Sequence, residues 1–158
     1  MQWTTREFNF DFSADEYPQI IDRLRNTPSR IEQLTSTTAP SNLIVQSDGK
    51  WSIQEHIGHL LDLEPLFTGR LDDFEASVVV LRPADMTNAK TYDADHNKGD
   101  ISVIMDTFKT VRGEMIQRLD EYAPEMFAKT ARHPRLNTPM RLVDSLYFQA
   151  EHDEHHIG

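Results

Sequence analysis

Cysteine is absent from the 158-residue sequence. This absence excludes disulfide bonds, thiolate metal ligands and a cysteine nucleophile, so a metal site would have to use His, Asp or Glu side chains. The chain also has no apolar run long enough to span a bilayer. Its first residues, MQWTTREFNFD, lack the apolar segment of a signal peptide. From the sequence we therefore expect a cytoplasmic protein.

Positive charge is also scarce. The sequence contains 16 Lys and Arg residues against 26 Asp and Glu residues, and its formal net charge is -10 at pH 7. A surface with this charge repels nucleic-acid phosphates and anionic lipid head groups, so we expect neither nucleic acid nor a membrane as a partner. Hydrophobic residues make up 38% of the chain. At this length the composition predicts one globular domain, residues 1–158, with a single core.

Four stretches of the chain show the periodicity of amphipathic helices. Apolar residues recur at helical spacing over residues of about 15–37, 52–79, 101–121 and 139–157. Pro28 lies inside the first stretch and should kink or interrupt that helix. Ser52 and Glu55 form a capping box at the start of the second, and Asp100 can cap the third. Four such helices predict an all-α protein, a four-helix bundle.

The connection over residues 80–100 is long and rich in Asp, Asn and Lys. Connections of this length are usually functional, so we expect it to cover a site as a lid, with Met86 and Tyr92 above the site. Its length also allows the second and third helices to be other than neighbours in a simple hairpin. Aromatic residues alternate over positions 8–12, which fits either a short strand or an extended arm packed on a helix.

Two histidines near the end of the chain have metal-ligand spacing. His152 and His156 are four residues apart, so on a helix both imidazoles lie on one face and can bind one metal ion. Two ligands bind weakly, and a third can come from a facing helix, where His59 lies at the edge of the buried face. Spacing alone also fits a solvated helix end at residues 152–156, with His56 and His59 as core histidines. The sequence has no Glu-x-x-His pattern, Gly-rich phosphate loop or Gly-x-Ser-x-Gly motif.

Two sequence motifs resemble those of one family. The segment WSIQEHIGHLLD, residues 51–62, resembles the second-helix signature of the DinB-like superfamily, with a Trp-Ser start, then His-Leu and an Asp two residues later. The segment AEHDEHHI, residues 150–157, resembles the C-terminal His-x-x-x-His of the same family. DGK at residues 48–50 and His-Pro at 133–134 agree with this resemblance. The most similar branch is the one that contains bacillithiol S-transferase.

The resemblance implies a metal site made by His59, His152 and His156. Zinc or nickel fits such a site best, with iron or copper as alternatives. It implies a small-molecule reaction, the transfer of a low-molecular-weight thiol to an electrophile, with the metal favouring the nucleophilic thiolate. Metal-assisted hydrolysis uses the same ligands and remains an alternative. A non-catalytic metal-binding module, or a stress-response dimer with vestigial histidines, is a further alternative, and the resemblance implies a homodimer.

Other polar residues near the expected site have a functional and a plain structural interpretation. Asp62 either orients a ligand histidine or is a solvated helix acid. Arg70 either binds a carboxylate of the substrate or forms a surface ion pair. Glu55 either acts as a general base or only caps the helix. We expect Ser145 and Gln149 on the floor of the pocket, His56 in the pocket or core, and His155 exposed.

Overall fold

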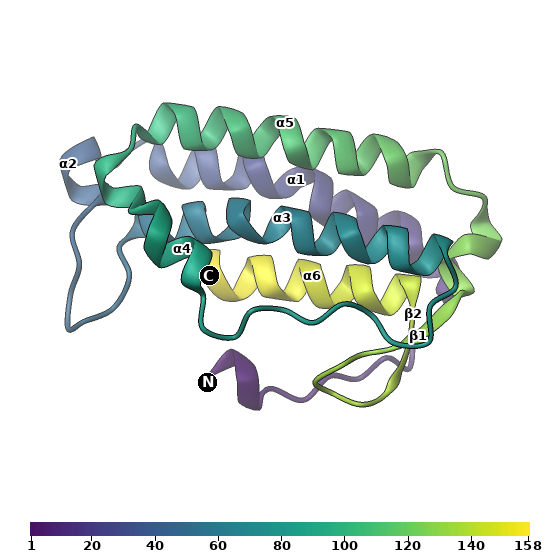
Figure 1. Cartoon of the computed structure of the whole chain (residues 1–158). Coiled ribbons are helices and arrows are strands. Elements are labelled where there is room, and N and C mark those ends of the chain that lie inside the picture. The colour runs from purple at the N-terminus through teal and green to yellow at the C-terminus, as the bar shows by residue number, and fades with distance from the viewer.

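Four long helices form the body of the protein, whose computed structural model describes residues 1–158. These helices are α1 (Tyr17–Thr35), α3 (Ile53–Glu75), α5 (Ile101–Asp120) and α6 (Leu142–Ile157). Helices α1 and α3 each pack against both α5 and α6 and lie diagonally across the bundle (Figure 1). The four-helix bundle predicted from the hydrophobic pattern is confirmed.

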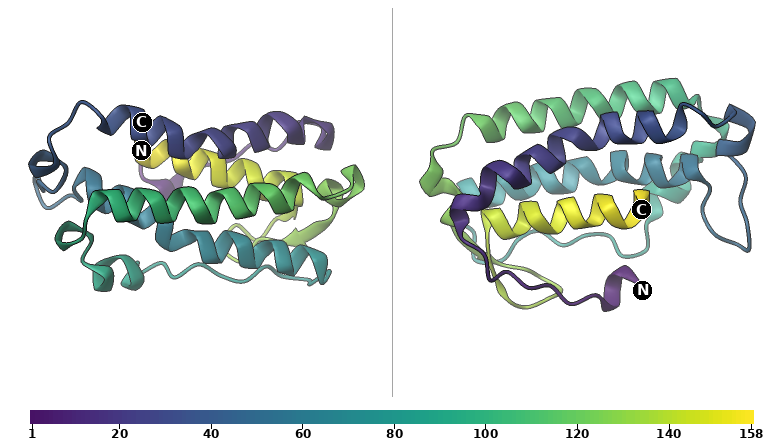
Figure 2. Two further views of the ribbon diagram at one scale, coloured as in Figure 1. Left: turned by 90° about the horizontal axis from the view of Figure 1, so that it is seen from above. Right: turned by 180° about the vertical axis from the view of Figure 1, so that it is seen from behind.

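The helices do not alternate up and down along the chain. In Figure 1, α3 and α5 run in the same direction, and α1 and α6 run in the opposite direction. The two views of Figure 2 show the same arrangement. The chain leaves the end of α3, returns along the outside of the bundle and enters α5 at the end where α3 began. The long connection therefore permits the parallel arrangement of α3 and α5, as its length predicted.

Pro28 does not interrupt α1, so this alternative of the sequence expectation is wrong. The helix continues through it from Tyr17 to Thr35. Because proline has no amide hydrogen, Pro28 cannot donate to the carbonyl of Leu24 one turn earlier. That carbonyl instead accepts a hydrogen bond of 3.0 Å from Nη1 of Arg112 on α5. The polar group that proline leaves free is thus satisfied by a neighbouring helix.

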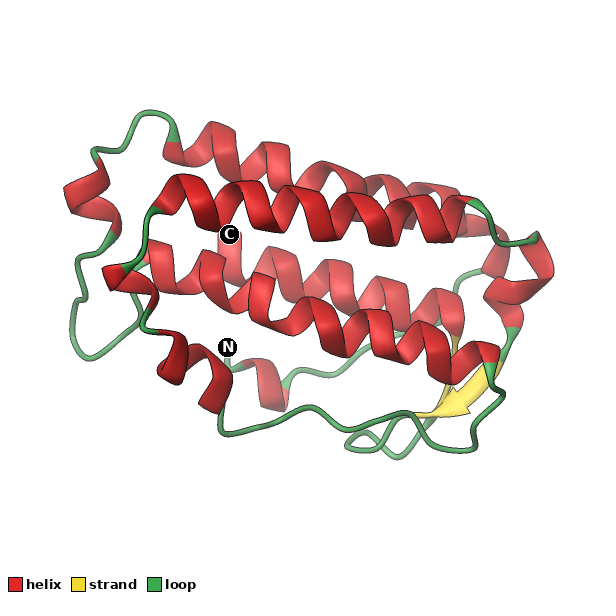
Figure 3. Cartoon of the chain, turned by 45° about the horizontal axis from the view of Figure 1, so that its top comes forward, coloured by secondary structure: helices red, strands yellow, loops and turns green.

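The ends of two helices differ from the predicted ones. Helix α3 starts with the predicted capping box of Ser52 and Glu55 but ends at Glu75, because Ser77 adopts a left-handed conformation with φ of 55°. Helix α6 starts at Leu142 and not at residue 139, because residues 139–141 form a strand. This strand, β2 (Pro139–Arg141), pairs antiparallel with β1 (Thr130–Arg132). The sheet, yellow in Figure 3, was not predicted.

Short helical turns fill the connections between the main helices. The segment expected as a lid contains α4 (Ala89–Ala94) and the 3-10 turn η3 (His96–Lys98). The other short elements are η1 (Trp3–Thr5), η2 (Ala14–Glu16), α2 (Pro40–Leu43) and η4 (Pro124–Ala128). Residues 8–12 form an arm and no strand: the ring of Phe8 lies 4.9 Å from that of Phe148 on α6. No helix of the protein is both long and apolar enough for a membrane span.

The core consists of two apolar clusters with a polar layer between them. One cluster lies around Leu24, Phe74 and Leu142 and the other around Ile31, Leu60 and Phe108. Between them the guanidinium of Arg112 forms ion pairs with Glu64 on α3 at 2.6 Å and Asp153 on α6 at 2.8 Å. Thr27 on α1 donates to the same Asp153 oxygen at 2.8 Å. The layer joins all four helices.

Candidate metal centre

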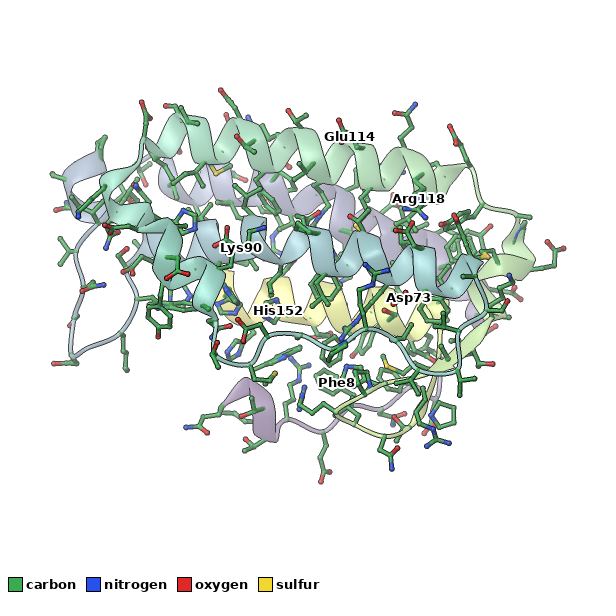
Figure 4. All side chains as sticks on the ribbon, viewed as in Figure 1. Phe8, Asp73, Lys90, Glu114, Arg118 and His152 are labelled. Atoms are coloured by element: carbon green, nitrogen blue, oxygen red, sulfur yellow. The ribbon has the colours of Figure 1, made fainter.

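Three histidines from two helices converge at one point. His59 on α3 and His152 and His156 on α6 each offer a ligand atom, and these atoms lie within 4.8 Å of one another. The ring centroid of His59 is 5.5 Å from that of His152 and 4.7 Å from that of His156. His152 appears on the lower side of the bundle in Figure 4, where the N-terminal arm carries Phe8. The structure thus brings together the three residues that the sequence singled out.

The hydrogen bonds of His59 determine its tautomer. The hydroxyl of Thr91 on α4 donates to Asp62 at 2.9 Å. Since a hydroxyl has one hydrogen, its oxygen must accept the 3.0 Å hydrogen bond that it forms with Nδ1 of His59. Nδ1 therefore carries the proton, and the lone pair of Nε2 is free for a ligand. Asp62 thus acts through Thr91 and is not a solvated helix acid.

His56 lies directly beside His156. Nδ1 of His56 is 2.8 Å from Nδ1 of His156, so one of these two nitrogens donates a hydrogen bond to the other. Nε2 of His156 is 3.2 Å from Nε2 of His152. Two imidazole nitrogens on one tetrahedral zinc ion, each at about 2.0–2.1 Å, are separated by about 3.3 Å. The spacing of the two nitrogens therefore fits a shared metal ion.

Burial keeps the three imidazoles neutral. It lowers the pKa of His59 to about 4 and that of His152 to about 3. Burial, followed by the neighbouring His152 and His59, lowers the pKa of His156 further still. Neutral imidazole is the form that binds metal. Nδ1 of His152 is buried and has no hydrogen-bond partner. The donor set fits a divalent metal ion.

The three histidines form part of the wall of a pocket of about 330 Å³. Apolar side chains of α3 and α6 line its middle, and both tryptophans line it near the histidines. The ring of Trp51 lies 4.8 Å from that of His59, and the ring of Trp3 lies 5.0 Å from that of His152. The remaining lining includes Leu63, Leu66, Phe67, Arg70, Met86, His133, Arg135 and Phe148. A small molecule that enters this pocket can reach the three histidines.

The segment expected as a lid is held down over the start of α3. Gln54 donates to the carbonyl of His96 at 2.6 Å, and Nε2 of His96 donates to Asp62 at 2.7 Å. The ring of His96 packs directly on Gly58, where an added Cβ would lie 2.3 Å from it. Met86 lines the pocket, but Tyr92 does not and is 63% exposed. The segment forms a wall of the site and supplies Thr91 to His59.

Several sequence expectations for the surroundings need correction. Ser145 and Gln149 are not in the pocket. Gln149 points into the core, where it donates to Glu64 at 3.5 Å. Phe148, the residue before it, lines the pocket instead. Glu55 caps α3, and its Oε1 also accepts from Gln46 and Asn97; it does not line the pocket. Arg70 forms no surface ion pair and is only 3% exposed. His155 is exposed, as expected.

Sequence reasoning missed Thr91, His96 and the pocket role of Trp3. Thr91 and His96 lie in the connection predicted only as a loop, and nothing in the spacing of TYDADHN links them to α3. Trp3 lies more than one hundred residues from His152, and only folding of the N-terminal arm brings the two together. A signal for His96 was present in Gly58, since a glycine inside a helix often marks a close approach of another segment.

Comparison with known families assigns the chain. A family model for the DinB superfamily matches residues 23–158. The chain belongs to the DinB superfamily. The match covers all four bundle helices except the first turns of α1, and it includes both motifs that carried the resemblance. The family prediction from sequence is therefore confirmed, while the metal-ligand role of the three histidines stays a prediction.

Two solved structures share the fold of this DinB-superfamily chain. YfiT from Bacillus subtilis, described as a probable metal-dependent hydrolase with an unusual four-helix bundle topology, has a TM-score of 0.77 and 21% identity, over 96% of this chain and 87% of that chain. The mycothiol-dependent maleylpyruvate isomerase has a TM-score of 0.70 and 9% identity, over 93% of this chain and 60% of that chain. At these identities the likeness establishes the fold alone. No curated protein matches the sequence.

Proposed function

We propose that the chain is a metal-dependent enzyme that transfers a low-molecular-weight thiol to an electrophilic small molecule. The observation that carries the proposal is the convergence of His59, His152 and His156, as neutral imidazoles, on the wall of a pocket. Three protein ligands leave at least one coordination position for an exogenous ligand, which is the pattern of catalytic sites. Zinc or nickel fits best, with iron or copper as alternatives.

The residues of the chain have distinct parts in this proposal. A bound divalent ion supplies a Lewis acid that lowers the pKa of a coordinated thiol or water. His59 is held in the ligand tautomer by Thr91 and Asp62, and Nδ1 of His156 forms a hydrogen bond with Nδ1 of His56. Trp51 and Trp3 shield the histidines on the pocket side and limit the access of bulk water. The pocket positions the electrophile near the thiolate.

Thiol transfer is supported by one structural neighbour, which is described as dependent on mycothiol, a low-molecular-weight thiol. Metal-assisted hydrolysis is the second candidate, and the description of YfiT as a probable metal-dependent hydrolase favours it. Both reactions need the same three histidines and one open position. They differ only in whether a thiol or water takes that position. The family resemblance also supports a homodimer, which sedimentation analysis at micromolar concentration tests.

The first experiment measures metal content by mass spectrometry in the purified protein and in three single variants, His59→Ala, His152→Ala and His156→Ala. The matched control is His155→Ala, because His155 is adjacent on α6 but exposed. We expect about one divalent ion per chain in wild type and in the control, and a loss in each of the three variants. Unchanged metal content in those variants would remove the proposal.

The second experiment separates the reactions on the metal-loaded protein. Bacillithiol, mycothiol, glutathione and cysteine are each combined with a chlorobimane electrophile, and ester and amide substrates are tested without thiol. Thiol-dependent turnover that disappears in His59→Ala supports transfer. Turnover of esters or amides without thiol, with the same dependence on His59, supports hydrolysis. Metal binding without either reaction supports the non-catalytic alternative.

A further inference from the structure

Two arginines of the pocket have no carboxylate partner. Most arginines of the chain form ion pairs, as do Arg82 with Asp73 and Arg141 with Asp144. Arg70 and Arg135 line the pocket, and neither takes part in any ion pair within the chain. Arg70 is only 3% exposed, and its one hydrogen bond runs from Nε to the carbonyl of Arg82 at 3.1 Å. A buried guanidinium with no counter-ion is costly, so a ligand that supplies an anion would be favoured here.

His133 adds an unused hydrogen-bond donor to the same end of the pocket. Its Nδ1 accepts from the backbone N–H groups of Arg135 at 3.1 Å and Leu136 at 3.0 Å. Nδ1 is therefore unprotonated, and the proton of the neutral ring must lie on Nε2. Nε2 of His133 is buried without any partner, and the residue is only 3% exposed. A buried N–H in a pocket wall lacks an acceptor that a ligand can provide.

The charge states of these groups suit an anion. Burial lowers the pKa of Arg70 to about 10, which still leaves the guanidinium charged at neutral pH. Burial, together with the charges of Arg70 and Arg135, lowers the pKa of His133 to about 4, so its ring is neutral. Asp85 also lines the pocket, and its carboxylate, which accepts from Thr87 and Ala89, keeps its negative charge. The lining therefore holds two guanidinium cations, one carboxylate and the neutral donor of His133, a net positive charge that suits an anion.

Helix α3 sets the separation between this end and the histidine cluster. His59, Leu63, Leu66 and Arg70 line the pocket at successive turns of the helix. Eleven residues separate His59 from Arg70, which corresponds to about 16 Å along a helix axis. The side chains between them are apolar and include Phe67 and, from α6, Phe148. The pocket therefore has a metal-ligand end, an apolar middle and a cationic end.

We propose that Arg70, Arg135 and His133 bind the oxyanion of the substrate, a carboxylate or a phosphate monoester, while the reacting group lies at His59, His152 and His156. The substrate class is thus an elongated molecule with an apolar middle and one anionic end. The assignment rests on the proposed function for the chemistry at the histidines. Binding of the anion itself requires no metal ion, so the two proposals can fail separately.

The test is a binding measurement with three probes of equal chain length. Octanoate carries a carboxylate, octyl phosphate carries a phosphate monoester, and octanamide is the neutral match of octanoate. Trp3 and Trp51 are the two tryptophans of the chain, and both line the pocket, so intrinsic fluorescence reports binding. Affinities are measured on the full chain as purified and again after treatment with a chelator, because a carboxylate can also bind a metal ion.

Three variants locate the anion. Arg135→Gln removes a partly exposed guanidinium whose only hydrogen bond is to the carbonyl of Thr4 at 3.3 Å, so this variant should fold. Arg70→Gln removes the buried guanidinium. His133→Asn removes the Nε2 donor while its amide oxygen can still accept from the backbone of residues 135 and 136. The matched control is Arg132→Gln, which removes an exposed arginine on β1 that lies outside the pocket.

We expect octanoate or octyl phosphate to bind about tenfold more tightly than octanamide, since a hydrogen bond to a charged group is stronger than a neutral one. Whichever anion binds more tightly identifies the head group. The preference should persist after chelation and in Arg132→Gln and should disappear in Arg135→Gln and Arg70→Gln. Equal affinities for anions and octanamide would overturn the proposal. So would a preference that chelation abolishes but Arg135→Gln leaves intact.

Discussion

Nη1 of Arg112 lies 2.8 Å from Oδ2 of Asp153, in the core directly behind the three histidines. Asp153 directly follows His152 on α6. The ion pair therefore fixes the position and rotation of α6 in the bundle at the turn that carries His152. The same guanidinium donates to Glu64 on α3, which follows His59 by five residues. The side chains of Arg112, Glu64 and Asp153 are 1%, 3% and 4% exposed. The polar layer therefore sets the relation of α3 to α6 on which the site depends.

Arg112→Met should strongly destabilise the protein. It leaves the carboxylates of Glu64 and Asp153 buried without their cation, and breaking a buried ion pair in this way costs about 3–5 kcal/mol of unfolding free energy. Chemical denaturation measures the loss. The control is Arg118→Met, because its pairs with Asp72 and Glu75 involve exposed carboxylates and should contribute at most about 1 kcal/mol. Similar losses in the two variants would contradict a special role of the layer.

Thr91→Val should weaken metal binding without unfolding the protein. The valine has nearly the same shape but cannot accept from Nδ1 of His59 at the position of the hydroxyl. Loss of such a partner of a ligand histidine typically reduces metal affinity about 10–100-fold. Competition with a chromophoric chelator measures the affinity. Thr91→Ser keeps the hydroxyl and should retain most of the metal affinity. Equal metal affinities in the valine and serine variants would show that the hydrogen bond is unimportant.

The fold was predictable because the apolar periodicity of the four helices reports a local property of the chain. The start of α3 was predictable for the same reason, since Ser52 and Glu55 bond each other's backbone within one turn. The continuity of α1 through Pro28 was not predictable, because it depends on Arg112, which is far away in sequence and satisfies the freed carbonyl. The strand at 139–141 was missed because three residues carry too little pattern to tell a strand from the first turn of a helix.

The convergence of the three histidines was predictable in part. The spacing of His152 and His156 shows that they share a helix face. The position of His59 at the edge of the buried face made it the candidate for the third ligand, and the family resemblance supported it over His56. Both residues lie near the site in the structure, and only their contacts distinguish them: His59 is bonded to Thr91 and His56 to His156. The cationic end of the pocket depends on the β1–β2 connection, whose path no local pattern encodes.

Gly58→Ala should destabilise the protein locally. The added Cβ would lie 2.3 Å from the ring of His96, and the ring cannot retreat without losing its hydrogen bond to Asp62. Overpacking of this kind typically costs about 1–3 kcal/mol. Gly113→Ala on α5 is the matched control, because an added Cβ meets nothing within 4 Å there, and it should stabilise the helix by about 0.5–1 kcal/mol. Thermal and chemical denaturation show whether each variant lowers or raises the free energy of unfolding. Hydrogen exchange should show the loss in Gly58→Ala concentrated over residues 89–98.

Asp73 should stabilise the protein at neutral pH but not in acid. Its carboxylate accepts from the backbone N–H of Arg82 at 2.9 Å and from the guanidinium of the same residue at 2.9 and 3.0 Å. The hydrogen bonds from the Arg82 side chain, the largest contribution, hold the pKa of Asp73 below its usual value. A carboxyl whose pKa is lower in the folded state stabilises the fold above its unfolded pKa, and this contribution is lost as pH falls through the folded pKa.

The unfolding free energies of wild type and Asp73→Asn should therefore differ most at neutral pH. The difference should begin to shrink as pH falls below about 4, the usual pKa of Asp, and should vanish below the lower pKa of the folded state. Urea denaturation over a series of pH values measures the difference. Asp106→Asn, which removes an exposed acid on α5, controls for the loss of one negative charge from an acidic chain. A difference between wild type and Asp73→Asn that is constant with pH would show that the amide disrupts packing and that the ionised carboxylate is not the source of the stabilisation.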